Sequence, residues 1–166
     1  LPLDTPLIGV VGRFTPWKGQ EVFLEIADRW IREDARAHFV LVGKAFNEDQ
    51  VFEARLRQFV AERGIGTRVH FIPFQKDPSA VFTGLTALLH PSTLPEPFGR
   101  VIVEAMAAEC CVVSTPTSGV VEQIEIEAPG ETAAAGPRGD DDPIDIHEAR
   151  ITGAEPQEVR AVVVGV

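Results

Sequence analysis

The chain has 166 residues, of which 45% are hydrophobic and 24% charged, a composition typical of a globular domain. No apolar run reaches the length of about 18 residues that a membrane-spanning helix needs. The net charge of −10 is uneven: residues 1–124 carry 15 acidic and 12 basic side chains, and residues 125–166 carry 10 and 3, so no basic surface for nucleic acid is expected.

Short apolar runs alternate with helical patterns along most of the chain. The predicted strands are 7–11, 38–42, 69–72, 87–90 and 111–114. The predicted helices begin after Gly19, at Asn47 as N-cap, at Pro78, at Gly99 and near Gly119. This alternation predicts βαβ units and a parallel sheet with helices on both faces. Ligands of such α/β folds bind at the carboxyl ends of the strands.

The helical patterns also predict which side chains face the core. In the first helix an inner face of Phe23, Ile26, Ala27 and Trp30 is expected. Its charged residues, Asp28, Arg29 and Arg32, are expected to face outward. The second helix is expected to end at Arg63 with Gly64 as its cap.

The chain changes character after Ile124. Residues 125–143 hold several glycines and prolines and three consecutive aspartates, which predicts loop or disordered chain. Residues 160–166 are apolar, and pairing as an edge strand is left open. We therefore separate an α/β domain, residues 1–124, from an atypical acidic tail, residues 125–166.

The two cysteines, Cys110 and Cys111, are adjacent and cannot form an ordinary disulfide with each other. They lie in an apolar run without a second pair of metal ligands, so we expect buried structural cysteines and no metal site. This cysteine usage fits a reducing, cytoplasmic setting.

Two cations flank a turn between the first strand and the first helix. Arg13 and Lys18 stand five positions apart in the segment from Gly12 to Gly19. A guanidinium and an ammonium at the start of a helix suit phosphate oxygens. A solvated turn with two surface cations is the alternative, and the pattern is neither a Walker loop nor the dinucleotide fingerprint.

Two carboxylates flank the start of the helix that follows the fourth strand. Glu96 lies in the loop, and Glu104 lies five residues beyond Gly99, roughly 7.5 Å along a helix. That gap matches the distance between a diphosphate at the helix start and a ribose of the same nucleotide. Glu104 is surrounded by apolar residues, which favours a buried polar role over a solvent-facing one.

A third candidate segment follows the fifth strand. Ser114, Thr115 and Gly119 precede an expected helix and could accommodate an anion, which is a weak signal alone. Among the histidines, His38 and His70 are expected to be structural. A structural role is also expected for His90, although its position near the proposed site leaves a functional role open.

These motifs, in this order, resemble the C-terminal domain of glycosyltransferase family 4, the group 1 glycosyltransferases, which are retaining enzymes of GT-B architecture. The resemblance covers about residues 7–124. The matching segments are Gly12-Arg13, Lys18-Gly19, Leu41-Val42-Gly43, Val69-His70-Phe71, Pro91-Ser92, Glu96-Pro97-Phe98-Gly99, Glu104-Ala105-Met106-Ala107, Val112-Val113-Ser114-Thr115, Gly119 and Glu122. It implies a Rossmann-like parallel sheet flanked by helices, the C-terminal half of a GT-B fold.

The resemblance also implies roles for single residues. Arg13 and Lys18 would neutralise the leaving diphosphate, and Glu96 would hold hydroxyls of the donor sugar. Glu104 would grip the ribose. The remaining implied donor contacts are Gly12, Phe98 and Gly99 near sugar and phosphate, the stretch Phe71-Ile72-Pro73-Phe74 near the base, and Ser114, Thr115 and Gly119 on the phosphate side.

The sequence departs from the family pattern at a few positions. The family usually has glycine where Glu109 stands, proline where Cys111 stands, and Gly-Gly where Ser118-Gly119 stands. The part after about residue 143 does not match, which suggests a truncated or frame-shifted end. The chain begins at Leu1 without a signal peptide pattern, and we expect it to be a piece of a longer protein.

The expected function is transfer of a sugar from a nucleotide-sugar donor to an unknown acceptor, with no metal or other cofactor. A missing N-terminal domain would bind the acceptor, so we expect the isolated domain to be inactive. A non-catalytic nucleotide-sugar-binding module and a GT-B sugar-nucleotide epimerase remain alternatives. We expect a cytoplasmic location, with peripheral attachment to the inner membrane face left open.

Overall fold

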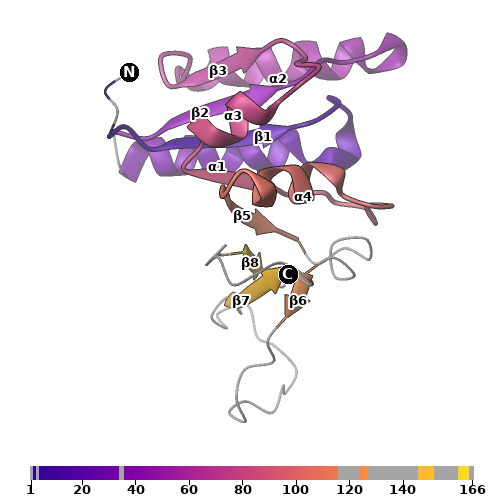
Figure 1. Cartoon of the computed structure of the whole chain (residues 1–166). Helices are drawn as coiled ribbons and strands as arrows, with labels where there is room; N and C mark the ends of the chain where they lie inside the picture. Colours follow the sequence, from indigo (N-terminus) through magenta and orange to yellow (C-terminus); the bar gives the residue numbers. More distant parts are fainter. Residues whose placement is uncertain are drawn as a thin grey trace, which may run out of the picture.

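A β-sheet with helices packed against it forms the centre of the molecule (Figure 1). The computed structural model describes residues 2, 4–33 and 36–115, and the backbone of strands 124–126, 146–151 and 161–164. The strands are β1 (Leu7–Val11), β2 (His38–Val42), β3 (Val69–Ile72), β4 (Ala87–His90), β5 (Cys111–Ser114), β6 (Ile124–Ile126), β7 (Ile146–Ile151) and β8 (Ala161–Val164). The helices are α1 (Gln20–Glu33), α2 (Gln50–Arg63), α3 (Ser79–Gly84) and α4 (Arg100–Ala107), with short 3₁₀ turns η1 (Pro16–Lys18) and η2 (Asn47–Asp49). The predicted bounds of β1 to β5 are confirmed.

The order of the described strands is β3-β2-β1-β4-β5-β8-β7-β6, and β1 to β5 pair in parallel. From β1 the chain first moves outward through β2 to β3, and then crosses back to β4 on the other side of β1. The direction of winding therefore reverses between β1 and β4. Loops after two such strands diverge to opposite faces, which opens a crevice at their carboxyl ends where ligands bind.

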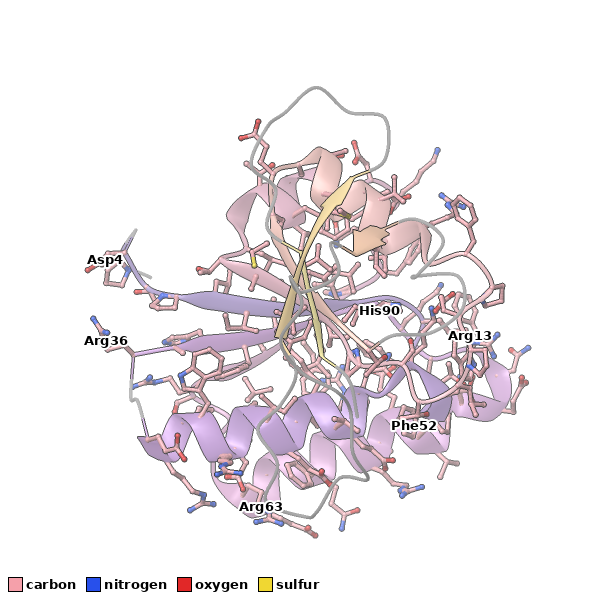
Figure 2. All side chains as sticks on the ribbon, turned by 90° about the horizontal axis from the view of Figure 1, so that it is seen from below. Asp4, Arg13, Arg36, Phe52, Arg63 and His90 are labelled. Atoms are coloured by element: carbon pink, nitrogen blue, oxygen red, sulfur yellow. The ribbon has the colours of Figure 1, made fainter. Side chains whose placement is uncertain are left out.

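Helices cover both faces of the sheet, as the strand composition predicts. Side chains alternate along each strand, so Phe39 and Leu41 of β2 pack with α1 and α2, while Val40 and Val42 pack with α3 and α4. Figure 2 shows the sheet between these two helical layers. In the same view Arg13 and His90 lie toward one end of the strands, and Asp4 and Arg36 lie toward the other.

Helix α1 differs from its predicted orientation in part. Ile26 and Trp30 were expected inside, but more than a third of each is exposed, whereas Leu24 is fully buried. Asp28 was expected to face outward and is buried. It accepts hydrogen bonds from Arg32 at 2.7 Å and from Arg63 of α2 at 3.2 Å, so it joins the two helices. This outcome depends on the placement of α2, which the local pattern does not contain.

Helix α2 ends as predicted and begins later than predicted. It stops at Arg63, with Gly64 in the left-handed conformation as its cap. Asn47 is not the N-cap, because residues 47–49 first form the turn η2 and Asp49 precedes the helix. This turn brings the carboxylates of Glu48 and Asp49 to the guanidinium of Arg13.

The region after residue 115 is described only at three strands. Pairing of the apolar segment 160–166 as an edge strand is an open alternative from the sequence. Residues 161–164 do form a strand, but this strand lies between β5 and β7 and not at the sheet edge. Residues 125 and 126 belong to β6, where a loop was expected, so the proposed domain boundary at residue 124 falls inside a strand. The helix expected near Gly119 lies outside the described residues. In the part of the chain that the structure describes, no helix combines the length and apolarity needed to cross a bilayer.

Candidate functional site

A pocket of about 540 Å³ lies at the carboxyl ends of the parallel strands. Its walls come from the loops after β1, β2, β3 and β4 and from the first turns of α4. The described lining residues are Val11, Gly12, Arg13, Lys18, Val42, Gly43, Lys44, Phe46, Phe74, Gln75, Lys76, Pro78, Glu96, Pro97, Phe98, Gly99, Arg100, Val101 and Glu104. The pocket therefore occupies the place where the strand order predicts a binding crevice.

Most of the site residues predicted from the sequence line this one pocket. They are Gly12, Arg13, Lys18, Phe74, Glu96, Phe98, Gly99 and Glu104. Phe71, Ile72, Pro73, Ser114 and Thr115 are not among the described lining residues. Phe71 instead packs edge-on against Phe14, with the Arg57 guanidinium 4.2 Å from its ring centroid. Gly119 lies outside the described residues.

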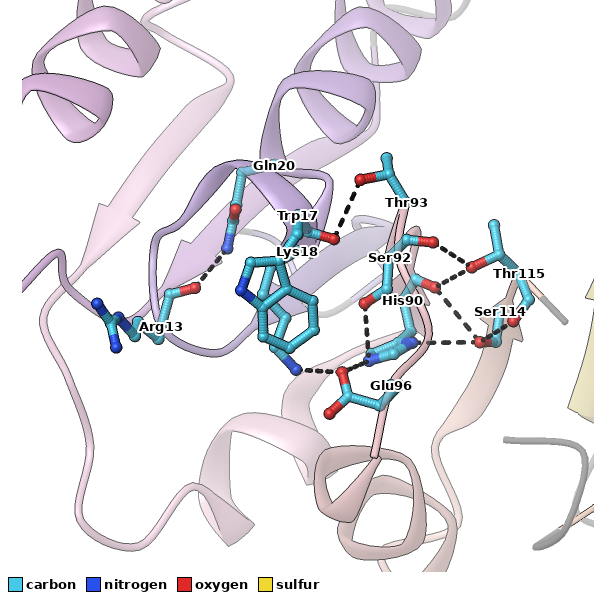
Figure 3. A network of polar contacts seen from close by, with 10 residues as sticks. All are labelled: Arg13, Trp17, Lys18, Gln20, His90, Ser92, Thr93, Glu96, Ser114 and Thr115. Carbon is cyan, nitrogen blue, oxygen red and sulfur yellow. Dashed lines mark hydrogen bonds and ion pairs between the residues drawn. The ribbon is translucent and has the colours of Figure 1, made fainter. Parts of the chain in front are cut away.

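The centre of the site is a buried ion pair between loops 78 residues apart in the sequence. Lys18 donates a hydrogen bond to Oε2 of Glu96 (Figure 3). Only 18% of the Lys18 side chain and 9% of the Glu96 side chain are exposed. The ammonium also stands 4.4 Å from the ring centroid of Trp17. Burial strengthens this attraction, because little water competes for either charge.

His90, the last residue of β4, lies behind the ion pair. Its Nε2 is 3.4 Å from Oε2 of Glu96 and 3.4 Å from Oγ of Ser92. Its Nδ1 is 3.2 Å from Oγ of Ser114 on the neighbouring strand β5. The residue is 4% exposed. Burial, and then the charge of Lys18, lower the pKa of His90, while Glu96 acts in the opposite direction, so the ring is neutral near pH 7.

The loops that carry Lys18 and Glu96 are fastened to each other. The carbonyl of Trp17 accepts a hydrogen bond from the backbone N–H of Thr93 at 2.8 Å and another from its hydroxyl at 3.3 Å (Figure 3). Gly19 has φ of 72°, and a Cβ there would stand 1.9 Å from the carbonyl oxygen of Pro91. Only glycine fits this contact. The position of Lys18 relative to Glu96 is therefore set by backbone contacts as well as by charge.

Arg13 stands at the mouth of the same pocket. Its guanidinium donates hydrogen bonds to Asp49 at 2.7 Å and to Glu48 at 3.3 Å, and its backbone carbonyl accepts from Gln20 at 2.8 Å. The hydrogen bond to Asp49 raises the pKa of Arg13 above its usual range. The Arg13 side chain is 46% exposed and therefore open to a ligand, while the Asp49 carboxylate that holds it is only 13% exposed.

Helix α4 presents its first turn to the pocket. It begins at Arg100, directly after Gly99, so its unpaired backbone N–H groups lie next to the lining residues. Glu104 lines the pocket from the next turn. A buried role was expected for it, but its side chain is 40% exposed, and it pairs with Arg100 at 3.2 Å. A half-exposed carboxylate at a pocket wall remains available to a ligand.

The sequence reasoning missed three cations of the pocket. Lys44, Lys76 and Arg100 line it together with Arg13 and Lys18. The ammonium of Lys44 lies 4.7 Å from the ring centroid of Phe46 and 5.6 Å from that of Phe74. Lys44 and Lys76 follow predicted strands at the edge already marked for ligands, so the strand ends alone could have indicated them.

The described residues contain no group of three or more His, Cys, Asp or Glu side chains placed to hold a metal ion. Cys110 is buried, and burial raises the pKa of its thiol to about 11, which leaves it protonated and unreactive at neutral pH.

The polar groups of the pocket are five cations, two carboxylates and helix-end amides. This combination suits an anionic ligand that also carries hydroxyl groups.

Comparison with known proteins identifies relatives of this chain. The chain is 27% identical over 129 residues to a lipopolysaccharide core biosynthesis mannosyltransferase, LpcC, of Rhizobium leguminosarum bv. viciae, covering 78% of this chain and 36% of that protein. The crystal structure of Anabaena Alr3699/HepE in complex with UDP-glucose has 33% identity and a TM-score of 0.67, covering 72% of this chain and 32% of that one.

A second solved structure is the C-terminal domain of a group 1 family glycosyl transferase, LpcC, from Francisella tularensis. It has 29% identity and a TM-score of 0.64, covering 70% of this chain and 61% of that one. The present chain thus spans about a third of the length of the Rhizobium and Anabaena proteins. The sequence model of the family described as "Glycosyl transferases group 1" matches residues 1–142, and the chain belongs to this family.

Proposed function

We propose that this chain is the donor-binding C-terminal domain of a GT-B glycosyltransferase that transfers a sugar from a nucleoside diphosphate sugar, with retention of configuration. The observation that carries the proposal is the convergence of Arg13, Lys18, Glu96 and Glu104 on one pocket at the start of α4. They come from two separate parts of the chain, the β1–α1 connection and the segment from the β4–α4 loop into α4, and no local structural requirement would bring these parts together.

In this proposal the cations receive the diphosphate. Lys18 and Arg13 flank the β1–α1 loop, and the amides of α4 face them across the pocket. When the bond to the sugar breaks, negative charge grows on the leaving diphosphate. Fixed cations and amides stabilise that charge without reorganising, which lowers the barrier. In this proposal, side chains and helix-end amides thus neutralise the leaving diphosphate.

The two carboxylates receive hydroxyl groups in this proposal. Glu96 lies beside Lys18 and would accept hydrogen bonds from the donor sugar. Glu104 lies one helical turn beyond Arg100 and would accept from the ribose hydroxyls. The complex of Anabaena Alr3699/HepE with UDP-glucose supports this class of donor.

The matched part of this chain covers only 36% of the Rhizobium protein and 32% of the Anabaena protein, which supports a second domain that supplies the acceptor site. We therefore expect the 166-residue chain to bind a sugar nucleotide and to transfer or hydrolyse little of it. The acceptor would enter on the open side of the pocket.

Calorimetric titration tests the donor site. Folded wild-type protein, with folding checked by circular dichroism, is titrated with UDP-glucose, GDP-mannose and ADP-glucose, and at least one is expected to bind. Glu104→Gln should weaken that binding about 10-fold, because a hydrogen bond to a charged group is lost. Glu25→Gln, an exposed carboxylate of α1 outside the pocket, is the matched control and should change nothing.

The results of this titration distinguish a working donor site from a vestigial one. Folded protein that binds none of the three donors would refute the proposal. Binding that Glu104→Gln leaves unchanged would show that the ribose contact is wrong and would favour a vestigial, non-catalytic module.

A further inference from the structure

The carboxylate of Glu96 has two neighbours in the site, and only one of them is accounted for by the proposed function. Lys18 donates to Oε2 of Glu96, and Nε2 of His90 lies 3.4 Å from the same oxygen. His90 is not among the described lining residues of the pocket, whereas Glu96, which it contacts in Figure 3, is. It is nevertheless a buried titratable group in contact with a proposed sugar-binding residue.

Binding of the sugar nucleotide would draw Lys18, the stronger of these two partners, away from Glu96. The proposed function directs the ammonium of Lys18 to the diphosphate, which weakens its bond to Glu96. Only 9% of the Glu96 side chain is exposed, so water can replace little of what is lost. A buried carboxylate without donors is costly and would rotate or take up a proton. A second hydrogen-bond donor that stays next to Glu96 prevents both the rotation and the protonation of its carboxylate.

The surroundings of His90 determine which nitrogen can carry the proton. A carboxylate accepts hydrogen bonds and cannot donate, so a favourable contact requires the proton on Nε2. The unprotonated Nδ1 can then accept from the hydroxyl of Ser114, 3.2 Å away, whose one proton also has the carbonyl oxygens of Thr115 at 3.0 Å and His90 at 3.3 Å within reach. The hydroxyl of Ser92 also lies 3.4 Å from Nε2. Ser92 is itself held, because its backbone carbonyl accepts from Thr115 at 2.8 Å.

We propose that His90 is a positioning residue, whose neutral ring donates Nε2–H to Glu96 and keeps that carboxylate aimed at the donor sugar while Lys18 engages the diphosphate. Ser114 of strand β5 contributes through its contact with Nδ1 of the same ring. The inference rests on the proposed function for the identity of the ligand, and on the geometry of the described residues for the contact.

The tautomer is measured on the wild-type chain without any ligand. Long-range ¹H–¹⁵N NMR spectra at pH 7.5 report which ring nitrogen of His90 is protonated, with the signal assigned by its loss in His90→Gln. A neutral ring with the proton on Nε2 is expected. A proton on Nδ1, or a doubly protonated ring, would overturn the proposal, since neither matches a neutral donor to Glu96.

A pair of substitutions tests the function of the contact. The amide nitrogen of glutamine can occupy the place of Nε2, and that of asparagine the place of Nδ1. We measure affinities for UDP-glucose and for UDP, or for GDP-mannose and GDP if that pair binds more tightly. His90→Asn should weaken sugar-nucleotide binding about 10-fold and binding of the free diphosphate less than about 2-fold. His90→Gln should stay within about 3-fold of wild type for both.

The result distinguishes this inference from the proposal on which it rests. Wild-type protein that binds neither nucleotide nor sugar nucleotide would refute the donor site, and with it the role of His90. Wild-type protein that prefers the sugar nucleotide, together with His90→Asn that keeps the same preference, would refute the role of His90 alone. Equal losses for both ligands in both variants would show a merely structural residue.

Discussion

The backbone at Glu109 has a conformation that favours glycine over a residue with a side chain. Glu109 follows α4 and has φ of 58°, the left-handed conformation that side chains with a Cβ rarely adopt. Its N–H donates to the carbonyl of Met106 at 2.9 Å, so the turn that ends the helix requires this conformation. The family resemblance leads one to expect glycine at this position, and the torsion angle supplies the physical reason.

Glu109→Gly should therefore stabilise the protein. Relief of the left-handed strain is worth roughly 1–2 kcal/mol, and the greater freedom of glycine in the unfolded chain offsets part of it. We expect a net gain of about 1 kcal/mol in the free energy of unfolding, measured by urea denaturation. Glu109→Ala removes the same carboxylate but keeps the Cβ, so it should give no comparable gain. Equal gains from both variants would contradict the strain argument.

At the scale of elements, β2 and β3 are joined by more than their backbone ladder. His38 and His70 stack with ring centroids 5.1 Å apart, and Nδ1 of His38 lies 2.8 Å from Nε2 of His70. One of these two nitrogens must be unprotonated for a hydrogen bond to form. Burial, followed by the proximity of His70 and Arg68, lowers the pKa of His38.

This pairing predicts acid sensitivity. The pKa of His38 is lower in the folded state than the value near 6.5 of an unfolded chain, so below about pH 6.5 the unfolded state binds more protons. The contribution of His38 is thus fully present above that pH and is lost as the pH falls through the folded-state pKa. We expect Tm to decrease from pH 7.5 to 5.5, and to decrease less in His38→Gln, since glutamine keeps a hydrogen bond and has no charge to gain. Parallel pH profiles of Tm would contradict this assignment, because His90 titrates alike in both proteins.

At the scale of the whole molecule, net charge and site charge have opposite signs. The chain carries −10, yet the described lining of the pocket has five cations and two carboxylates. Much of the acidic excess lies in residues 125–166, with 10 acidic and 3 basic side chains. Fields of exposed charges are screened beyond about 10 Å at ordinary ionic strength, so local cations should dominate the attraction of an anionic ligand.

The sign of the salt dependence tests this balance. Raising NaCl from roughly 50 to roughly 500 mM should weaken the binding of a nucleoside diphosphate several-fold, since it screens the pocket cations. If the overall negative charge governed binding, the same salt would strengthen it. The uncharged nucleoside serves as the control, and its weak binding should not change. Affinity of the diphosphate that rises with salt would contradict a cationic donor site.

Some residues of the candidate site could be predicted from the sequence, and others could not. Residues such as Arg13, Glu96 and Gly99 could be placed at the pocket because they follow strands, and parallel strands present their carboxyl ends to the same edge of the sheet. Lys44 and Lys76 follow strands too, but no motif distinguished them from surface lysines. Phe71 lies on a strand next to the expected site, and its side chain points away because the sheet alternates.

Local sequence patterns are enough to predict the bounds of β1 to β5, the end of α2 at Arg63 and the α/β class, because hydrophobic period, glycine caps and strand composition act over a few residues. The folded chain alone accounts for three further features: the burial of Asp28 against Arg63, the place of residues 161–164 inside the sheet, and the contacts of Glu96 with both Lys18 and His90. Such contacts join residues far apart in the chain, and their energies arise from burial and charge in an environment that exists only once the sheet has formed.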